Sequence, residues 1–132
     1  MSFDRQGANT VLPKLERKTR IEAENLVSNT SATLYTVPAG KTFYLSSATI
    51  NATLVAANSS GNGFIEHDTG GDASFITIGR IYLNTSALID RMAESMSIQI
   101  SVPQSFIAGT VFRVRSGDLN YYVWAHIFGW EE

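Results

Sequence analysis

From about residue 30 onward, hydrophobic and polar residues alternate in short segments, which is the two-residue period of β-strands. In the segment 97–102, the isoleucines and Val102 are expected to face inward, with polar residues between them. The segment 110–116 follows the same period and places Arg113 and Arg115 on its outward face. Each alternation predicts a strand with one buried face.

Clusters of Gly, Pro, Asn and Asp separate these segments and predict turns. The expected strands are 33–37, 41–50, 51–57, 64–67, 74–83, 97–102, 110–116 and 121–130, with turns at 38–40, 58–63, 68–72 and 117–120. Beyond the N-terminal region, only Leu88 to Glu94 is a helix candidate. Roughly seven to nine short strands at this spacing predict an all-β fold, a β-sandwich. A jelly roll is its most natural form at this length, although periodicity does not specify the strand order.

The first 29 residues differ from the rest of the chain. Charged residues are concentrated between residues 14 and 24, and the sparse apolar residues follow neither the strand period nor the helix period cleanly. We therefore expect an N-terminal arm over residues 1–29, extended or with a short helix, and a β-sandwich domain over residues 30–132. Such an arm buries too little apolar surface to order itself, so it is either disordered or bound to a partner.

The final strand segment, 121–130, is apolar on both faces. One face carries Tyr121, Val123, Ala125 and Ile127, and the other carries Tyr122, Trp124, His126, Phe128 and Trp130. A β-sandwich buries one face of each sheet, so the second face needs another cover: the arm, a loop or another subunit. Tyr and Trp are enriched at interfaces, and monomers avoid exposing such a patch. We favour a subunit interface in a cyclic oligomer, with cover by the chain's own arm as the alternative.

Composition narrows the classes of function. The 132-residue chain has the size of one domain, and its net charge of −2 supplies no basic field for nucleic acid. It has no cysteine, which excludes disulfides, zinc-thiolate sites and cysteine nucleophiles. Neither a secretory signal nor a membrane-spanning stretch is recognised, so we expect a soluble protein made in a cytosol, with no membrane partner.

Two short motifs resemble catalytic sequences. Gly-Lys-Thr at 40–42 lacks the earlier glycine and the following helix of a nucleotide-binding loop. Asp-Thr-Gly at 68–70 resembles retroviral-type aspartic proteases, in which two subunits each supply one aspartate. However, Glu66 and His67 stand where an apolar strand should deliver that aspartate. We expect a hairpin turn and no enzyme, and an aspartic protease remains a remote alternative.

Other polar residues allow binding but do not specify it. The acidic segment from Glu66 to Asp72 could hold a cation, but it lacks the Asp-X-Asp spacing of a calcium loop, so a solvated loop is expected. Arg113 and Arg115 could meet a carboxylate or phosphate bidentately, or could simply keep the outer face polar. We therefore expect no cofactor and no metal.

Two segments resemble a known class of proteins. Tyr35-Thr-Val-Pro-Ala-Gly-Lys-Thr-Phe-Tyr-Leu45 and the closing Ile127-Phe-Gly-Trp-Glu131 are similar to segments of the small β-sandwich virion proteins of tailed bacteriophages. The resemblance covers roughly residues 35–132. It implies a jelly roll that assembles as a homotrimer, with an N-terminal arm that reaches neighbouring shell subunits. Capsid decoration (cement) proteins and the heads of short fibres are both of this kind.

The resemblance implies a decoration protein on the outer surface of the capsid, assembled in the host bacterial cytoplasm, with itself and the major capsid protein as partners. A fibre or tail head that binds a carbohydrate receptor through the loops 58–63 and 68–72 is the alternative. In a decoration protein, the arm would bind the shell through apolar and basic side chains. These are Phe3, Val11, Leu12, Lys14, Leu15, Arg17, Lys18 and Arg20.

Overall fold

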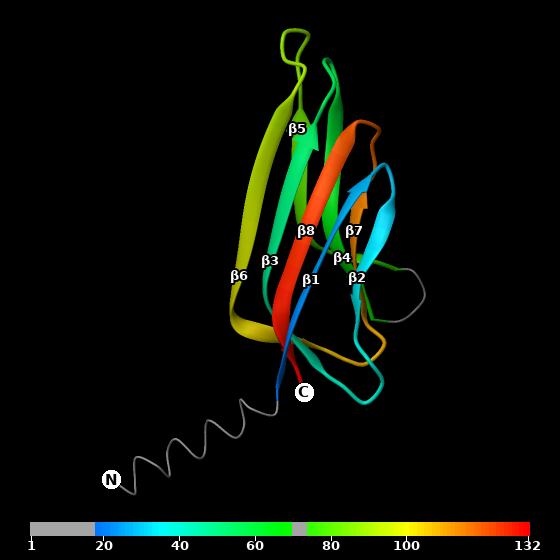
Figure 1. Cartoon of the computed structure of the whole chain (residues 1–132), viewed down its shortest axis with the longest axis vertical. Helices are drawn as coiled ribbons and strands as arrows, with labels where there is room; N and C mark the ends of the chain where they lie inside the picture. Colours follow the sequence, from blue (N-terminus) through cyan, green and yellow to red (C-terminus); the bar gives the residue numbers. More distant parts are fainter. Residues whose placement is uncertain (1–17, 70–73) are drawn as a thin grey trace, which may run out of the picture.

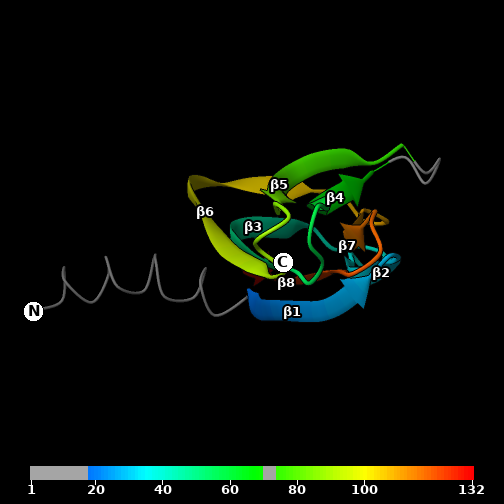
Figure 2. The ribbon, with the colours of Figure 1, turned by 90° about the horizontal axis from the view of Figure 1, so that it is seen from above.

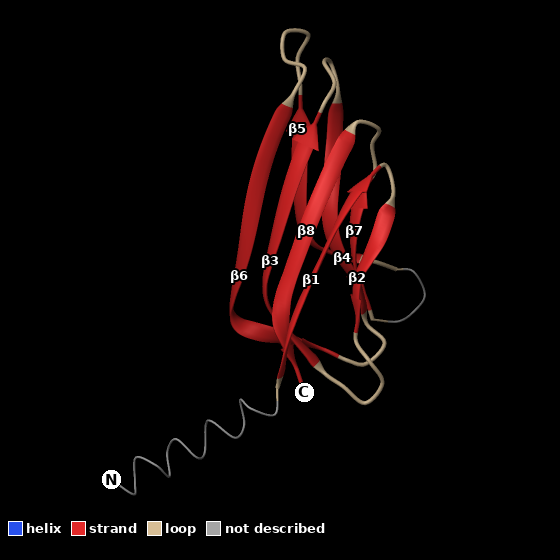
Figure 3. Cartoon of the chain, in the orientation of Figure 1, coloured by secondary structure: helices blue, strands red, loops and turns tan. Residues whose placement is uncertain are grey.

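A computed structural model describes residues 18–69 and 74–132 (Figure 1). The elements are β1 (Thr19–Ser28), β2 (Ser31–Thr36), β3 (Phe43–Leu54), β4 (Ser60–Asp68), β5 (Ile76–Asn84), β6 (Met92–Phe106), β7 (Val111–Ser116) and β8 (Tyr121–Glu131). Strands and loops make up both described ranges (Figure 3), and neither contains a helix long and apolar enough to cross a membrane.

The strands form two four-stranded antiparallel sheets that pack face to face (Figure 2). The first sheet has the order β1-β8-β3-β6, and the second has the order β2-β7-β4-β5. This is the strand order of an eight-stranded jelly roll, in which neighbours in the chain mostly lie in opposite sheets. The predicted all-β sandwich is confirmed, and the strand order makes it a jelly roll.

The core between the sheets is built from the inward residues of the alternating strands. On β8, Tyr121, Val123, Ala125 and Ile127 are all fully buried, as the two-residue period predicts. Burial of each large apolar side chain contributes roughly 1.5–3 kcal/mol. The Tyr121 hydroxyl donates a 2.8 Å hydrogen bond to the carbonyl oxygen of Ile81 on β5, which links the two sheets. Burial is the main reason that the pKa of Tyr121 is raised to about 12.

Several element boundaries differ from the expected ones. The expected strands 41–50 and 51–57 contribute to one strand, β3, which continues through the expected boundary at Asn51. The expected turn at 58–63 is shorter, because β4 begins at Ser60. Glycine occurs in turns and also at strand positions where another side chain approaches closely, so glycine content alone does not distinguish the two.

The glycines at the start of β4 make room for the side chains of β8. A Cβ atom at Gly61 would overlap Cδ2 of the Tyr121 ring, and one at Gly63 would lie 2.6 Å from Cγ2 of Val123. Each of these Cβ atoms would be closer to its neighbour than a normal van der Waals contact allows. These glycines therefore serve core packing between the sheets, and the structure places them in a strand and not in a receptor-binding loop.

The sandwich begins earlier than expected. β1 covers Thr19–Ser28, which the sequence pattern assigned to the arm, and it pairs along its whole length with β8. Ile21, Ala23 and Val27 point toward the core, while Glu22, Glu24 and the exposed Leu26 occupy the outward positions between them. The pairing satisfies the backbone hydrogen bonds that an isolated charged segment would leave to water. The expected boundary at residue 30 is wrong, and only residues 1–17 remain as a candidate arm.

Two expectations around β6 are also wrong. Leu88 to Glu94 is not a helix: it is a loop followed by the start of β6 at Met92. Val102 was expected to face inward, but it is 80% exposed. The register of β6 against β3 is interrupted between Gln99 and Gln104, so the alternation of the preceding residues does not continue through this bend.

Candidate functional site

The outer face of the first sheet carries the aromatic residues that the sequence pattern marked as an interface. Tyr122, Trp124, His126, Phe128 and Trp130 point away from the core and form what we call the β8 aromatic row. Tyr122 is 43% exposed and the others are partly buried. The Trp124 and His126 rings stack with centroids 6.0 Å apart, and those of Phe128 and Trp130 lie 5.6 Å apart.

Strand β1 borders this row with charged side chains. Glu22 lies 3.3 Å from Arg20 and 3.4 Å from Nε2 of His126. The Arg20 guanidinium lies over the Phe128 ring at 4.8 Å, and Lys18 lies over the Tyr44 ring at 4.5 Å. Lys18 and Arg20 were predicted to belong to a free arm, but they contact the aromatic side chains of the first sheet. The remaining predicted arm residues lie outside the described part of the chain. They are Phe3, Val11, Leu12, Lys14, Leu15 and Arg17.

The other border of the row is uncharged, and its side chains are small beside Tyr122, Trp124 and His126. On β3, the residues opposite the row include Thr49, Asn51 and Thr53, and β6 continues the surface with Ser95 and Ser97. In residues 18–69 and 74–132, no element packs over this face. The row is thus an outward-facing aromatic stripe between β3, which is largely polar here, and β1, which is charged except for the exposed Leu26 opposite Trp124. Cover by residues 1–17 stays an untested alternative.

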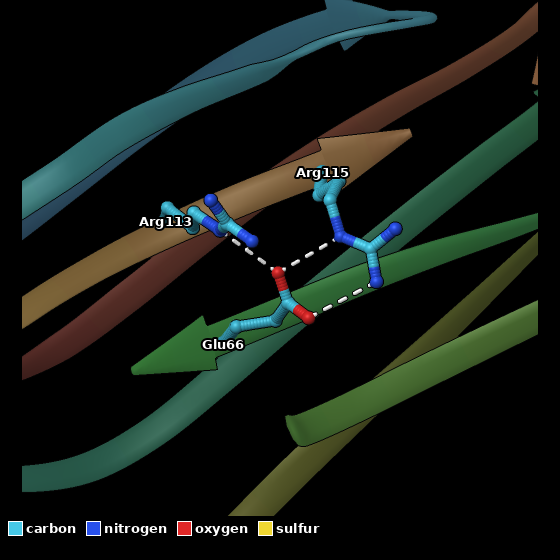
Figure 4. Close-up of polar contacts among 3 residues, drawn as sticks. All are labelled: Glu66, Arg113 and Arg115. Atoms are coloured by element: carbon cyan, nitrogen blue, oxygen red, sulfur yellow. Dashed lines mark hydrogen bonds and ion pairs between the residues drawn. The ribbon is translucent and has the colours of Figure 1, made fainter. Parts of the chain in front are cut away.

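The outer face of the second sheet is organised around one carboxylate. Glu66 on β4 is 4% exposed and accepts hydrogen bonds from two arginines of β7 (Figure 4). Nε and Nη2 of Arg115 lie 3.0 Å and 3.1 Å from its two oxygens, and Nε of Arg113 lies 2.9 Å from Oε1. The register places Glu66 opposite Arg113. The partner that the sequence left open for both arginines is therefore Glu66, and Arg115 contacts it bidentately.

Aromatic rings support both arginines. The guanidinium of Arg113 lies 3.5 Å from the Phe75 ring centroid, and that of Arg115 lies 4.1 Å from the Phe64 ring centroid. Burial disfavours the Glu66 carboxylate, but the hydrogen bonds and charges of Arg115 and Arg113 outweigh this effect and lower its pKa. Glu66 is a buried structural anion and not part of a solvated loop, so that expectation is wrong for this residue.

The neighbouring residues of β4 do not form a metal site in the described ranges. No group of three or more His, Cys, Asp or Glu residues that could hold a metal is found there. Asp68, the aspartate of the protease-like motif, is buried at the end of β4 opposite Val111. His67 points to the core between Phe106 and Phe112, with ring centroids 4.9 Å and 6.1 Å away.

His67 is held as a neutral side chain. Its Nδ1 is buried and has no hydrogen-bond partner within the described part of the chain. Burial lowers the pKa of His67 below its usual value, although the nearby Asp68 carboxylate acts in the opposite direction. A charged imidazole at this position would therefore destabilise the fold.

We expect the free energy of unfolding to fall as the pH is lowered below about 6.5. The unfolded chain protonates His67 near its ordinary pKa and the folded chain does so only at lower pH, so stability decreases by at most about 1.4 kcal/mol per pH unit in this window. A second loss follows below about pH 4.5 as Glu66 becomes protonated. Urea unfolding at several pH values measures both. In the His67→Phe variant, the free energy of unfolding should depend less on pH just below pH 6.5 and should still fall below about pH 4.5. An unchanged pH dependence just below pH 6.5 would contradict the assignment of the first loss to His67.

The segments 35–45 and 127–131 meet at one end of the sandwich. Phe43 pairs with Glu131, and Thr42 and Glu132 exchange backbone hydrogen bonds of 3.0 Å and 2.9 Å. The Tyr35 hydroxyl donates to the carboxylate of Glu131. Although far apart in the chain, these segments form one structural unit. The start of β3 and the end of β8 therefore pack together.

The sequence pattern did not predict that β1 contributes to the surface around the β8 aromatic row. Glu22 and Glu24 line a shallow hollow beside His126 on the outer face. The alternation of Arg20, Glu22 and Glu24 with apolar residues was the available signal, but the high charge of the segment concealed it.

Comparison with known proteins supports the fold. No known family and no curated protein matches the sequence. Among solved structures, the chain is similar to the Eiger TNF of S. frugiperda, with a TM-score of 0.55 and 7% identity over 83% of this chain and 92% of that one. At this identity the similarity concerns the fold alone.

Viral capsid proteins are also among the similar structures, at lower TM-scores. A pentameric capsid protein isolated from metagenomic phage sequences has a TM-score of 0.47 and 14% identity, over 84% of this chain and 59% of that one. The structure of infectious bursal disease virus, Gx strain, has a TM-score of 0.44 and 12% identity, over 87% of this chain and 32% of that one. This chain thus spans about three fifths of the first of these proteins and about a third of the second.

Proposed function

We propose that this protein is a structural protein of a tailed-bacteriophage virion, which binds the outer surface of the head shell as a homotrimer and stabilises it. The observation that carries the proposal is the β8 aromatic row, which lies on the outer face of a jelly roll without cover from the described residues. The resemblance of residues 35–45 and 127–131 to phage virion proteins supports the same assignment. Its partners would be further copies of itself and the major capsid protein.

The proposed mechanism is mechanical. A protein that binds the expanded shell, but not its precursor, stabilises the expanded form by mass action. Three subunits that each contribute a weak contact bind together far more tightly than one, because the later contacts form at high effective concentration. Residues 1–17, which directly precede β1, are the segment that we propose contacts the shell. The protein would carry out no reaction, and it would assemble onto shells in the host cytoplasm.

We expect the purified chain to be larger than a monomer and to bind expanded, DNA-free head shells of its phage saturably. Deletion of residues 1–17 keeps β1 and the sandwich intact, so the oligomer should persist while shell binding is lost. Light scattering after size-exclusion chromatography and co-sedimentation with shells measure the two properties.

Each outcome bears on a separate part of this proposal. A monomeric full-length chain would contradict the oligomer. Shell binding that survives the deletion would contradict the role of residues 1–17. Absence of binding to expanded shells at saturating concentrations would contradict the decoration function itself.

A carbohydrate-binding fibre or tail head is the second candidate, and one observation favours it. The Trp124 and His126 rings are stacked nearly parallel, at 10°, and flat aromatic side chains with polar tips suit contacts with partly polar ligands. This candidate predicts binding to host surface polysaccharide that is lost in Trp124→Ala and does not depend on residues 1–17. If the protein binds polysaccharide in this way and does not bind shells, it is a receptor-binding head and not a decoration protein.

A further inference from the structure

The symmetry of a trimer sets a condition on its interface. A surface patch that contacts its own copy produces a two-fold dimer, whereas a closed ring of three needs two different patches that fit each other. The β8 aromatic row is one patch. If the proposed trimer is correct, a second surface elsewhere on the same chain must cover the row of the neighbouring subunit.

The edge of the sandwich between β5 and β6 has the properties of such a surface. These two strands belong to different sheets and do not pair, and side chains of both line a hollow between them. Figure 2 shows β5 on the opposite side of the sandwich from β1. Tyr82 is 51% exposed and Ile76 is 58% exposed on this edge strand. The hollow between the strands is lined by Arg80, Ile81, Tyr82, Glu94, Ser95 and Met96.

Between Ser95 and Val102, the free edge of β6 contains neither a charged residue nor a proline. Natural sheets block their edges with charged residues, bulges or prolines. From Ser95 to Phe106 the strand contains no charged residue, and Pro103 is its one proline. The inward side chains Met96 and Ile98 remain only partly buried. An uncharged edge with partly exposed apolar residues is typical of a surface that contacts another molecule.

The charges of the two surfaces are complementary. Arg80 is exposed on β5 and forms no ion pair with any residue in the described ranges. Glu24 is exposed beside the β8 aromatic row and likewise has no ion pair there, whereas Glu22 already contacts Arg20 and His126. A guanidinium in the hollow formed by Glu22, Glu24 and His126 would meet carboxylate oxygens.

We propose that the β5–β6 edge of one copy packs on the β8 aromatic row of the next, with Arg80 opposite Glu24, and that this head-to-tail contact closes the ring. The inference rests on the proposed oligomer and specifies its second surface. Tyr82 and Met96 would then contact the aromatic side chains, and the interface would be apolar at its centre and charged at its border.

The first test is a charge exchange. Arg80→Glu and Glu24→Arg should each place like charges together and weaken association at least about tenfold, seen as dissociation at higher protein concentration in sedimentation velocity. The double variant should restore association to near the wild-type level. Lys41→Glu makes the same charge change as Arg80→Glu at an exposed turn position outside both surfaces and should have no effect. Failure of the double variant to restore association would overturn the Arg80–Glu24 contact.

The second test distinguishes a head-to-tail ring from a face-to-face dimer. Trp124→Ser should damage only the aromatic row and Arg80→Glu only the edge, so each variant alone should be monomeric. A mixture of the two retains one intact pair of surfaces and should form dimers. A wild-type oligomer that is unaffected by Arg80→Glu would overturn this inference while leaving the proposed oligomer in place. A monomeric wild-type chain would overturn both.

Discussion

Replacing Glu66 with glutamine is expected to lower the free energy of unfolding by about 3 kcal/mol, because removing one member of a buried ion pair leaves the others uncompensated. The glutamine side chain would keep the shape of the original one but would leave the guanidinium groups of Arg113 and Arg115 without a counter-charge. These side chains are 26% and 34% exposed, so water recovers part of the loss and the effect should lie near the lower end for buried pairs. Urea denaturation near pH 7.5 measures it.

Glu22→Gln is the matched control for this prediction. Glu22 also contacts an arginine, but both side chains are about half exposed, and such surface pairs contribute at most about 1 kcal/mol. Replacing Glu66, Arg113 and Arg115 together by Leu, Met and Met should cost less than Glu66→Gln alone, since no buried charge remains unpaired. If Glu66→Gln and Glu22→Gln lower the free energy of unfolding equally, the ion pairs of Glu66 with the two arginines do not stabilise the second sheet.

Replacing Gly129 with alanine is expected to lower the melting temperature by more than about 10 °C, or to prevent folding. A Cβ atom at this position would overlap the backbone carbonyl oxygen of Tyr44 and would lie 2.7 Å from Cζ of Phe43. Backbone in the middle of a sheet cannot move without breaking the pairing of β3 with β8, and forced overpacking costs about 3 kcal/mol or more. For a domain of about 130 residues, a loss of about 3 kcal/mol in the free energy of unfolding lowers the melting temperature by roughly 10 °C.

Gly117→Ala serves as the control substitution. The nearest atom to a Cβ at Gly117 is Nη1 of Arg115 at 3.6 Å, which is an ordinary contact, so its stability should change by less than about 1 kcal/mol. Thermal unfolding followed by circular dichroism compares the two variants. A Gly129→Ala protein as stable as Gly117→Ala would contradict the close approach of β3 and β8.

The strand pairing behind these predictions also explains which sequence expectations succeeded. The inward set on β8 was predicted correctly because a fully apolar alternation remains buried in any sandwich topology. The partner of Arg113 and Arg115 was left open because Glu66 is far away in the chain, at separations of 47 and 49 residues. Only the pairing of β4 with β7 brings these three side chains together.

The proposed interface around β8 was likewise predicted in part from the sequence and in part only from the structure. The sequence identified the β8 aromatic row as an outward apolar stripe, but it assigned the adjoining β1 to the N-terminal arm. A charged segment with few apolar residues does not order itself, and β1 is ordered because β8 supplies its hydrogen-bond partners. The charged hollow formed by Glu22, Glu24 and His126 exists only because of this pairing.

The sequence by itself determined the all-β class, the alternating faces of the strands and the aromatic stripe, since each depends on residues that are neighbours along the chain. The tertiary structure decided the order of the strands, the start of the sandwich at Thr19, the burial of Glu66 and the open edge between β5 and β6. These features depend on contacts between segments far apart in the sequence. The hydrophobic period says which face of a strand is buried but not against which partner.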